Sequence, residues 1–289
     1  MKKKIIVGTL FLMMVSTMVV SASNIDVKEN NIKKTVVVDE VDVPVWGVGD
    51  SWTYNENYNQ FGYRIDGTPA LIWYHNCTST YTVINDTGDT YTVELTSENN
   101  EGSILIGMFR LQFTPYTKLY QKLEHRKTDL AYVSYFHQEK GPVFWLIGKI
   151  GLPMPAYYKI DEEDFFEPAN ELIPFPLSVG KTGTFASYIN TGYEKMSLYF
   201  GLIKLVDADY SNEIPARDYT CNIASITVPA GTFEAYNISR DMGSSQNFSY
   251  SYYVPEVGFD AKWVTHTELD SGEPYTNVKA ELVSTTYTP

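Results

Sequence analysis

The stretch ITVPAGTFEAYNISRD, from Ile226 to Asp241, predicts two β-strands joined by a tight turn. β-Branched and aromatic residues are frequent in both arms, and such residues suit a pleated, half-buried surface. Pro229 presets the backbone of the turn, Gly231 supplies a position where φ can be positive, and Phe233 returns to the core. Nothing in the stretch is reactive, so it indicates a scaffold rather than a catalytic site.

The same pattern recurs along the chain. YTVINDTGDTYTVEL (Tyr81 to Leu95) alternates polar with aromatic and β-branched residues around an Asp/Gly turn, and predicts a second hairpin. MFRLQFT (Met108 to Thr114) and KMSLYFGLIKL (Lys195 to Leu205) place apolar residues at alternate positions, as in strands with one buried face. Because helical periodicity is scarce, we predict an all-β, mainly antiparallel protein with few short helices.

The N-terminus has the features of a secretory signal. MKKK precedes the apolar run IIVGTLFLMMVSTMVV, and small residues follow it. We expect a signal peptide at 1–22, cleaved after Ala22, and a flexible charged leader at 23–43 that ends in a short strand. An uncleaved membrane anchor is the alternative, although the run is short for a span. No transmembrane span is expected after cleavage, and the protein is predicted to be secreted or held at the cell surface.

The rest of the chain divides into two predicted halves, residues 44–170 and 171–289. The acidic run DEEDFFEP (Asp161 to Pro168) and the prolines that follow it indicate the boundary. VGDSWTY (Val48 to Tyr54) and VGKTGTF (Val179 to Phe185) share a Val-Gly start and a Thr-aromatic ending, which suggests related halves. The sequence leaves open whether they form one continuous sheet or two domains.

Charge excludes some partners. The chain has 35 acidic and 22 basic residues, a formal net charge of −13, which becomes −16 when Lys2, Lys3 and Lys4 leave with the signal peptide. Nucleic acids and anionic membrane surfaces select basic patches, so neither is an expected partner. The sequence does not indicate which proteins, if any, bind the chain.

Two cysteines remain in the mature chain, Cys77 and Cys221. In an oxidising compartment they are a candidate disulfide, and two buried free thiols are the alternative. Four Asn-x-Ser/Thr sequons are candidate glycosylation sites, relevant only where the host glycosylates exported proteins. Their asparagines are Asn76, Asn85, Asn237 and Asn247.

The search for chemistry yields no catalytic, cofactor or metal site. Asp86-Thr87-Gly88 and Asp270-Ser271-Gly272 look like half-sites of an aspartic protease, but both occur where tight turns are expected. Asp207 to Asp218 approximates a calcium loop without its glycine and its bidentate glutamate. The four histidines lack metal-ligand spacing. We therefore predict a non-enzymatic protein without a cofactor.

One apolar stretch stands apart from the alternating strands, GPVFWLIGKIGLPMPAYY (Gly141 to Tyr158). It is too short to span a bilayer. A buried strand, a short helix closing a sheet and a flap over an apolar cavity all fit it. The candidate contacts to an apolar ligand are Trp145, Leu146, Ile147, Ile150 and Leu152.

Three motif blocks resemble a group of exported bacterial and archaeal β proteins of unknown function. PVWGVGDSWTY matches their Trp-x-x-Gly-Asp-x-Trp-x-Tyr opening, VPAGTF is shared, and SYYVPEVGFDAKW matches a later aromatic strand. In place of a second tryptophan the chain has Gly183. The resemblance implies structural roles for Trp46, Gly49, Asp50, Trp52, Tyr54, Pro229, Gly231, Phe233, Pro255 and Gly258.

A more distant resemblance links HRKTDLAYV (His125 to Val133) to the lipoprotein-carrier superfamily. It implies curved antiparallel sheets or half-barrels around an apolar cavity. The function it implies is binding of a lipid or another apolar small molecule in that cavity. The alternative is a cell-surface structural or adhesion protein, including a carbohydrate-binding one, which suits the acidity, the sequons and the Tyr/Asn/Thr-rich faces.

Overall fold

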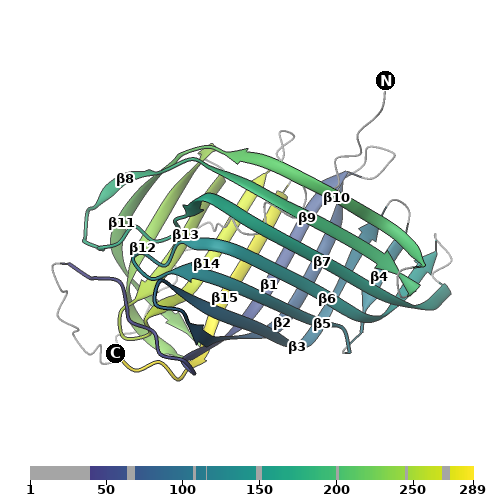
Figure 1. The fold of residues 1–289 in the computed structure, drawn as a ribbon, viewed down its shortest axis with the longest axis horizontal. Coiled ribbons are helices and arrows are strands. Elements are labelled where there is room, and N and C mark those ends of the chain that lie inside the picture. The colour runs from purple at the N-terminus through teal and green to yellow at the C-terminus, as the bar shows by residue number, and fades with distance from the viewer. Residues whose placement is uncertain are drawn as a thin grey trace, which may run out of the picture.

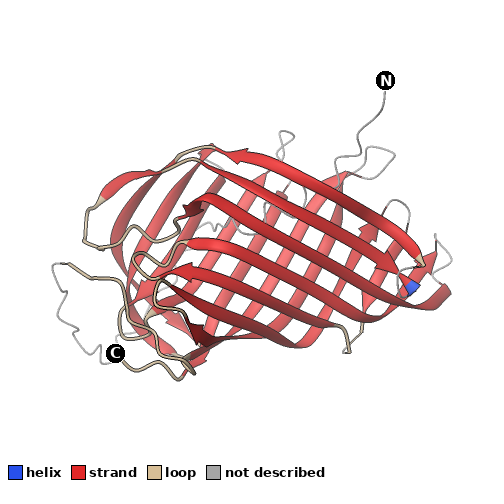
Figure 2. Ribbon diagram, in the orientation of Figure 1, coloured by secondary structure: helices blue, strands red, loops and turns tan. Residues whose placement is uncertain are grey.

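The computed structural model describes residues 40–63, 69–106, 109–114, 116–147, 152–199, 202–244, 247–268 and 274–289. The predicted signal peptide and the leader up to residue 39 lie outside these ranges. The described part is mainly strand and contains no α-helix; its helical content is a single 3₁₀ residue, Tyr199 (Figure 2). The all-β, antiparallel prediction is confirmed.

The strands are β1 (Ser51–Tyr63), β2 (Pro69–Asp86), β3 (Thr90–Ile106), β4 (Phe109–Phe113), β5 (Lys118–Arg126), β6 (Tyr132–Ile147), β7 (Leu152–Asn170), β8 (Thr182–Phe185), β9 (Tyr188–Leu198), β10 (Ile203–Ile214), β11 (Arg217–Val228), β12 (Gly231–Ser244), β13 (Asn247–Val254), β14 (Phe259–Glu268) and β15 (Pro274–Thr285). They form one antiparallel sheet in the order β10-β9-β7-β6-β4-β3-β2-β1-β15-β14-β13-β12-β11-β8. β5 shares the place of β4 between β3 and β6.

The sheet is rolled, so that its two ends approach each other (Figure 1). β8 is the last strand at one end and β9 is the second strand from the other, yet only Ala186 and Ser187 separate them in the chain. Because consecutive Cα atoms are about 3.8 Å apart, Phe185 and Tyr188 can be at most about 11 Å apart. The roll creates an enclosed concave face, into which alternate residues of each strand point.

One continuous sheet joins the two predicted halves. β1 pairs with β15 and β7 pairs with β9, so strands of the second half flank both sides of the first. The run Asp161–Pro168 lies inside β7 and is not a boundary between domains. Its acids alternate, with Glu162 and Asp164 buried and Glu163 exposed, which is the period of a strand rather than of a solvated linker.

Residues 171–181 connect β7 to β8 and pack on the concave face. Ile173 and Leu177 are buried there in a cluster with Cys221, Tyr236, Ile238 and Tyr253. Pro174 and Pro176, which follow the acidic run, lie in this connecting segment. Val41, near the end of the predicted leader, forms an isolated antiparallel bridge with Leu177.

The two Val-Gly turns have matching structures. Gly49 and Gly180 both adopt positive φ, at 101° and 80°. The N–H of Gly49 donates to the carbonyl of Val83, and the N–H of Gly180 donates to the carbonyl of Cys221, each at 2.8 Å. Each turn leads into a strand, β1 or β8. The related stretches therefore correspond in local structure.

Gly183 shows where the two stretches diverge. It pairs with Tyr219 across β8 and β11, and a Cβ at Gly183 would lie 2.6 Å from the Tyr219 hydroxyl oxygen. The ring of Tyr219 thus occupies the space beside the backbone that a tryptophan at this position would need. The equivalent position in the first stretch, Trp52, is filled by its own side chain.

The motif residues of the opening block anchor the largest core cluster. The indole N–H of Trp46 donates to the carbonyl of Gly258 (2.9 Å), and that of Trp52 donates to the carbonyl of Val257 (2.7 Å). The Tyr54 hydroxyl donates to the carbonyl of Asp260 (2.7 Å). A buried donor needs a partner, and here three donors all find theirs in the later motif block. These hydrogen bonds therefore tie the opening block to the later block inside the core.

The remaining motif positions build turns. β11 and β12 pair up to Val228↔Gly231, which confirms the hairpin predicted from Ile226 to Asp241. Gly231 has a φ of 146° and Phe233 packs against the same core cluster. Asp50 accepts the N–H of Gly47 at 2.6 Å, and the turn from Pro255 ends at Gly258, whose φ is 67°.

The described parts of the apolar stretch Gly141–Tyr158 are two paired strands, with residues 148–151 outside the description. The end of β6 pairs with the start of β7 from Gly141↔Tyr158 to Ile147↔Leu152. β6 also pairs with β4 here, so the stretch lies within the sheet and is neither a helix nor a flap. A different expectation is wrong: Lys195 to Leu205 is not one strand, because β9 ends at Leu198 and Tyr199 turns the chain with a φ of 51°.

Candidate ligand cavity

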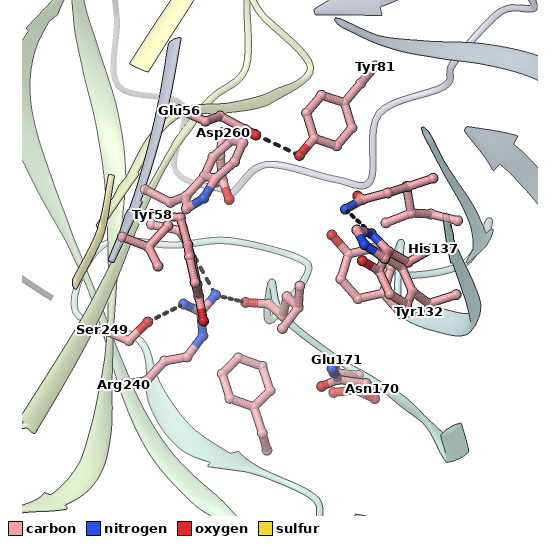
Figure 3. A pocket seen from close by; sticks show the side chains of 18 of the residues that line it. Glu56, Tyr58, Tyr81, Tyr132, His137, Asn170, Glu171, Arg240, Ser249 and Asp260 are labelled. Carbon is pink, nitrogen blue, oxygen red and sulfur yellow. Dashed lines mark hydrogen bonds between the residues drawn. The ribbon is translucent and has the colours of Figure 1, made fainter. Parts of the chain in front are cut away.

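A cavity of about 210 Å³ lies on the concave face (Figure 3). Side chains reach it from strands on both sides of β1, from β5 and β6 as well as from β12, β13 and β14. Strands this far apart in the sheet order line one space because the sheet is rolled. The apolar side chains that line it include Leu119, Leu123, Leu172, Phe185, Phe259 and Val278.

Aromatic side chains with polar tips complete much of the wall. Tyr58 and Trp73 meet edge to face at 5.7 Å, and Trp263 packs on Tyr54 at 4.6 Å. Such pairs fix the orientation of their rings beyond simple area burial. The cavity therefore has a wall of defined shape rather than a loose gap in the core.

Arg240 brings a positive charge to the cavity from β12. Its Nη1 donates to Ser249 Oγ and its Nη2 to Ser251 Oγ, both at 3.1 Å, and Nη2 also donates to the carbonyl of Leu172 (Figure 3). Its Nε is buried without a hydrogen-bond partner in the described part of the chain. Burial lowers the pKa of Arg240 to about 10, so the guanidinium remains charged at neutral pH.

Three carboxyl groups line the same space, and two of them, Glu56 and Asp260, have raised pKa values. Glu56 accepts hydrogen bonds from Ser79 Oγ (2.7 Å) and Tyr81 Oη (2.9 Å), so its oxygens already have donors. Burial raises the pKa of Glu56, and these hydrogen bonds oppose the rise. Burial also raises the pKa of Asp260 to about 7, against the opposing effects of Arg240 and of a hydrogen bond from Ser251.

The cavity histidines are neutral. Burial lowers the pKa of His75 to about 4 and that of His137 to about 3. His75 Nε2 lies 2.8 Å from Asn100 Oδ1, and His137 Nδ1 accepts from Gln121 Nε2 at 3.2 Å. They contribute polar surface to the cavity but no charge at neutral pH.

A second polar zone on the concave face, the acidic row, consists of Glu139 of β6, Glu162 and Asp164 of β7, and Glu194 of β9. Each is 2% exposed or less, and Glu162 pairs directly with Glu194 across β7 and β9. Like charges directly opposite one another are destabilising. Burial raises the pKa of Glu139 to about 8 and that of Glu194 to about 7, so protonation relieves the repulsion.

Tyr210 of β10 links two members of the acidic row. Its hydroxyl oxygen lies 2.6 Å from Asp164 Oδ1 and 3.1 Å from Glu162 Oε1. A phenol has one proton to donate, so at most one of these contacts uses the tyrosine proton. The other requires a protonated carboxyl group that donates to the tyrosine oxygen, and burial accordingly raises the pKa of Glu162 well above its ordinary value.

Gly192→Ala is expected to lower the free energy of unfolding by about 2 to 3 kcal/mol. Its Cβ would lie 2.4 Å from the carbonyl oxygen of Glu163 and 2.6 Å from the hydroxyl of Tyr210, so the tyrosine must leave the acidic row. Urea unfolding measures the loss. Gly47→Ala is the control, because its Cβ meets only Asp50 at an ordinary 3.6 Å; equal losses in both variants would contradict the role given to Gly192.

The structure does not form the candidate disulfide. Cys77 and Cys221 are both buried free thiols, on β2 and β11, with five strands between them in the sheet order. This matches the alternative interpretation of the sequence. Burial raises the pKa of both thiols, that of Cys221 to about 11, so neither is activated as a nucleophile.

Other predicted site residues remain partly or wholly untested. Asn85 is exposed, whereas Asn76, Asn237 and Asn247 are half-buried within strands; glycosylation stays a prediction for all four. The five candidate ligand contacts lie at the β6–β7 hairpin. Four of them, Trp145, Leu146, Ile147 and Leu152, belong to β6 and β7, but the structure describes only their backbone, and Ile150 lies outside the described residues altogether.

The acidic motifs that resemble protease and calcium sites have structural roles where the structure describes them. Asp86 forms an ion pair with Lys127 and accepts the N–H of Gly88 (2.9 Å) at the β2–β3 turn, whereas Asp270 lies outside the described residues. Asp207 belongs to β10 and pairs with Lys204 at 2.6 Å. Across the described ranges no group of three or more His, Cys, Asp or Glu side chains has the geometry to hold a metal ion.

The sequence analysis did not identify Arg240 as a cavity residue, although Arg240 lies within the hairpin stretch Ile226–Asp241. Tyr236, Ile238 and Arg240 alternate along β12, and the first two are buried. An arginine that continues the buried face of a strand is the signal that could have identified it. Glu162 and Asp164 show the same signal, obscured by the exposed Glu163 between them.

Within the described ranges no helix has the length and apolarity needed to cross a bilayer. Comparisons with protein-family models, with curated proteins and with solved structures give no match. The resemblances read from the motifs therefore remain predictions, and the cavity and its residues carry the functional argument.

Proposed function

We propose that this protein is an exported, non-enzymatic binding protein that holds a small, largely apolar ligand in the cavity of the rolled sheet. The observation that carries the proposal is the cavity itself. It has about 210 Å³ of space lined by leucine, valine and aromatic side chains. An apolar cavity of about 150 Å³ already admits a ligand the size of benzene.

The polar groups of the cavity are compatible with an apolar ligand. Glu56 has its donors within the protein, and His75 and His137 are neutral. Burying a polar group costs free energy unless it is hydrogen-bonded. These groups already have partners, so an apolar body against the leucine and valine wall need not leave them unsatisfied.

The experiment is titration of the mature chain with the neutral fluorescent probe N-phenyl-1-naphthylamine. We expect saturable binding, and at least a tenfold loss of affinity in Val278→Phe, because the added ring fills the cavity. Val48→Phe is the matched control, since Val48 is 64% exposed. Absence of saturable binding by the wild type, or equal binding by both variants with intact unfolding transitions, would refute the proposal.

The alternative, a cell-surface structural or adhesion protein, is favoured by one observation. β10 pairs only with β9 within the described ranges, which leaves a twelve-residue edge. Asp207, Asp209 and Glu213 are exposed along it. Charged residues on an edge strand oppose pairing with a further strand, so the edge supports an assembly role less well than the cavity supports binding.

A further inference from the structure

We propose that the cavity selects small amphipathic carboxylates, and that Arg240 binds the carboxylate while the apolar wall holds the rest of the ligand. This inference rests on the proposed function and names its ligand class. Arg240 is a charged side chain in a largely apolar cavity.

Arg240 has donors to spare. A guanidinium carries five N–H donors, and Nη1 and Nη2 make three hydrogen bonds in the described part of the chain, to Ser249, Ser251 and the carbonyl of Leu172. The ring of Phe185 lies 5.9 Å from the guanidinium carbon and uses no N–H donor. The buried Nε is without a partner. An unused donor on a buried cation favours a ligand with an anionic oxygen, because a charge-assisted hydrogen bond is about twice as strong as a neutral one.

Arg240 also lacks a direct counter-ion. No described carboxylate oxygen lies within the 4.0 Å that defines an ion pair. Asp260 lies beyond that distance: it shares Ser251 with Arg240 as a hydrogen-bond partner, and the two groups interact electrostatically without a direct ion pair. The second arginine that lines the cavity, Arg217, adds charge of the same sign.

The other two acids of the cavity, Glu56 and Glu171, interact with residues other than Arg240. Glu56 is satisfied by Ser79 and Tyr81, and Glu171 is exposed and lies 3.8 Å from Arg126. An unpaired buried charge is costly, and a ligand carboxylate would relieve that cost. Glu56 and Asp260 would oppose a second negative charge, so a monoanion fits better than a dianion.

Displacement of the neutral probe by matched ligands tests the inference. We expect octanoate to displace it at a concentration at least tenfold lower than 1-octanol does in the wild type. Arg240→Gln should abolish this preference while leaving displacement by 1-octanol within about twofold. Lys140→Gln is the control, since it removes an exposed charge of the same sign.

A second variant keeps the test independent of how Arg240→Gln folds. Asp260→Asn removes the acid that shares Ser251 with Arg240, so octanoate should bind three- to tenfold more tightly. Equal displacement by octanoate and 1-octanol in the wild type would overturn the inference and leave the proposed function standing. Failure of every ligand and of the probe would refute both, and tighter binding of octyl phosphate than of octanoate would overturn the carboxylate class.

Discussion

Trp52→Ala is expected to lower the free energy of unfolding by about 5 kcal/mol. Trp52 is fully buried, and its ring packs against Trp46 at 5.1 Å and Phe259 at 5.4 Å. Truncating a buried aromatic residue costs about 3 to 5 kcal/mol. The change also removes the donor to the carbonyl of Val257, and a buried acceptor left unpaired adds about 1 kcal/mol or more.

Two further variants separate the parts of this effect. Trp52→Phe keeps a buried ring but loses the N–H, so we expect an intermediate loss of about 2 kcal/mol. Val48→Ala, at an exposed position in the same turn, should stay within about 0.5 kcal/mol of the wild type. Urea unfolding of the protein measures all three, and a loss below about 2 kcal/mol for Trp52→Ala would contradict its place at the centre of the core.

Stability is expected to fall by about 3 kcal/mol between pH 6.5 and pH 8.5. The causes are buried carboxyl groups: burial raises the pKa of Glu139 to about 8, and those of Glu194 and Asp260 to about 7. In this range the folded protein still holds protons that the unfolded chain has released. The unfolded state binds fewer protons, so raising the pH through these folded-state pKa values removes stability.

Below pH 6.5 buried histidines impose the opposite slope. Burial lowers the pKa values of His75 and His125 to about 4 and that of His137 to about 3. Between these values and about pH 6.5 the unfolded chain takes up protons that the folded chain cannot. Stability conferred by the neutral histidines is therefore lost as the pH falls, and this loss opposes the stability that the protonated carboxyl groups still gain between pH 6.5 and their unfolded-state pKa values of about 4.

Of the three carboxyl groups, Glu139 is expected to contribute most to the loss of stability at alkaline pH, and Glu139→Gln isolates its contribution. Because glutamine does not ionise, the fall between pH 6.5 and pH 8.5 should shrink by about 2 kcal/mol in this variant. Glu98→Gln, an exposed position, should reproduce the wild-type slope. Chemical unfolding across the pH range gives the comparison, and an unchanged slope in Glu139→Gln would show that this carboxyl group is already ionised in the folded state.

Local pattern predicted the strand content and several hairpins because strand and turn preferences act over a few neighbouring residues. Tyr81–Leu95 and Ile226–Asp241 each form the expected hairpin. The prediction erred at Asp161–Pro168, where four acids in succession suggested a solvated break. A strand turns every second residue inward, and Glu162 and Asp164 are accommodated inside by Tyr210 and by protonation. Neither compensation can be read from neighbouring residues.

The sequence by itself determined the β character, the hairpins and the motif residues that form the core, since alternation, turn residues and buried tryptophans are local signals. Only the tertiary structure decided that the two halves form one sheet, that both cysteines stay free, and that Arg240 faces the leucines of β5 across a cavity. The physical reason is the roll of the sheet. It brings the end of β8 close to the start of β9 and sets strands far apart in sequence around one space. This arrangement depends on pairings between distant strands that no local pattern encodes.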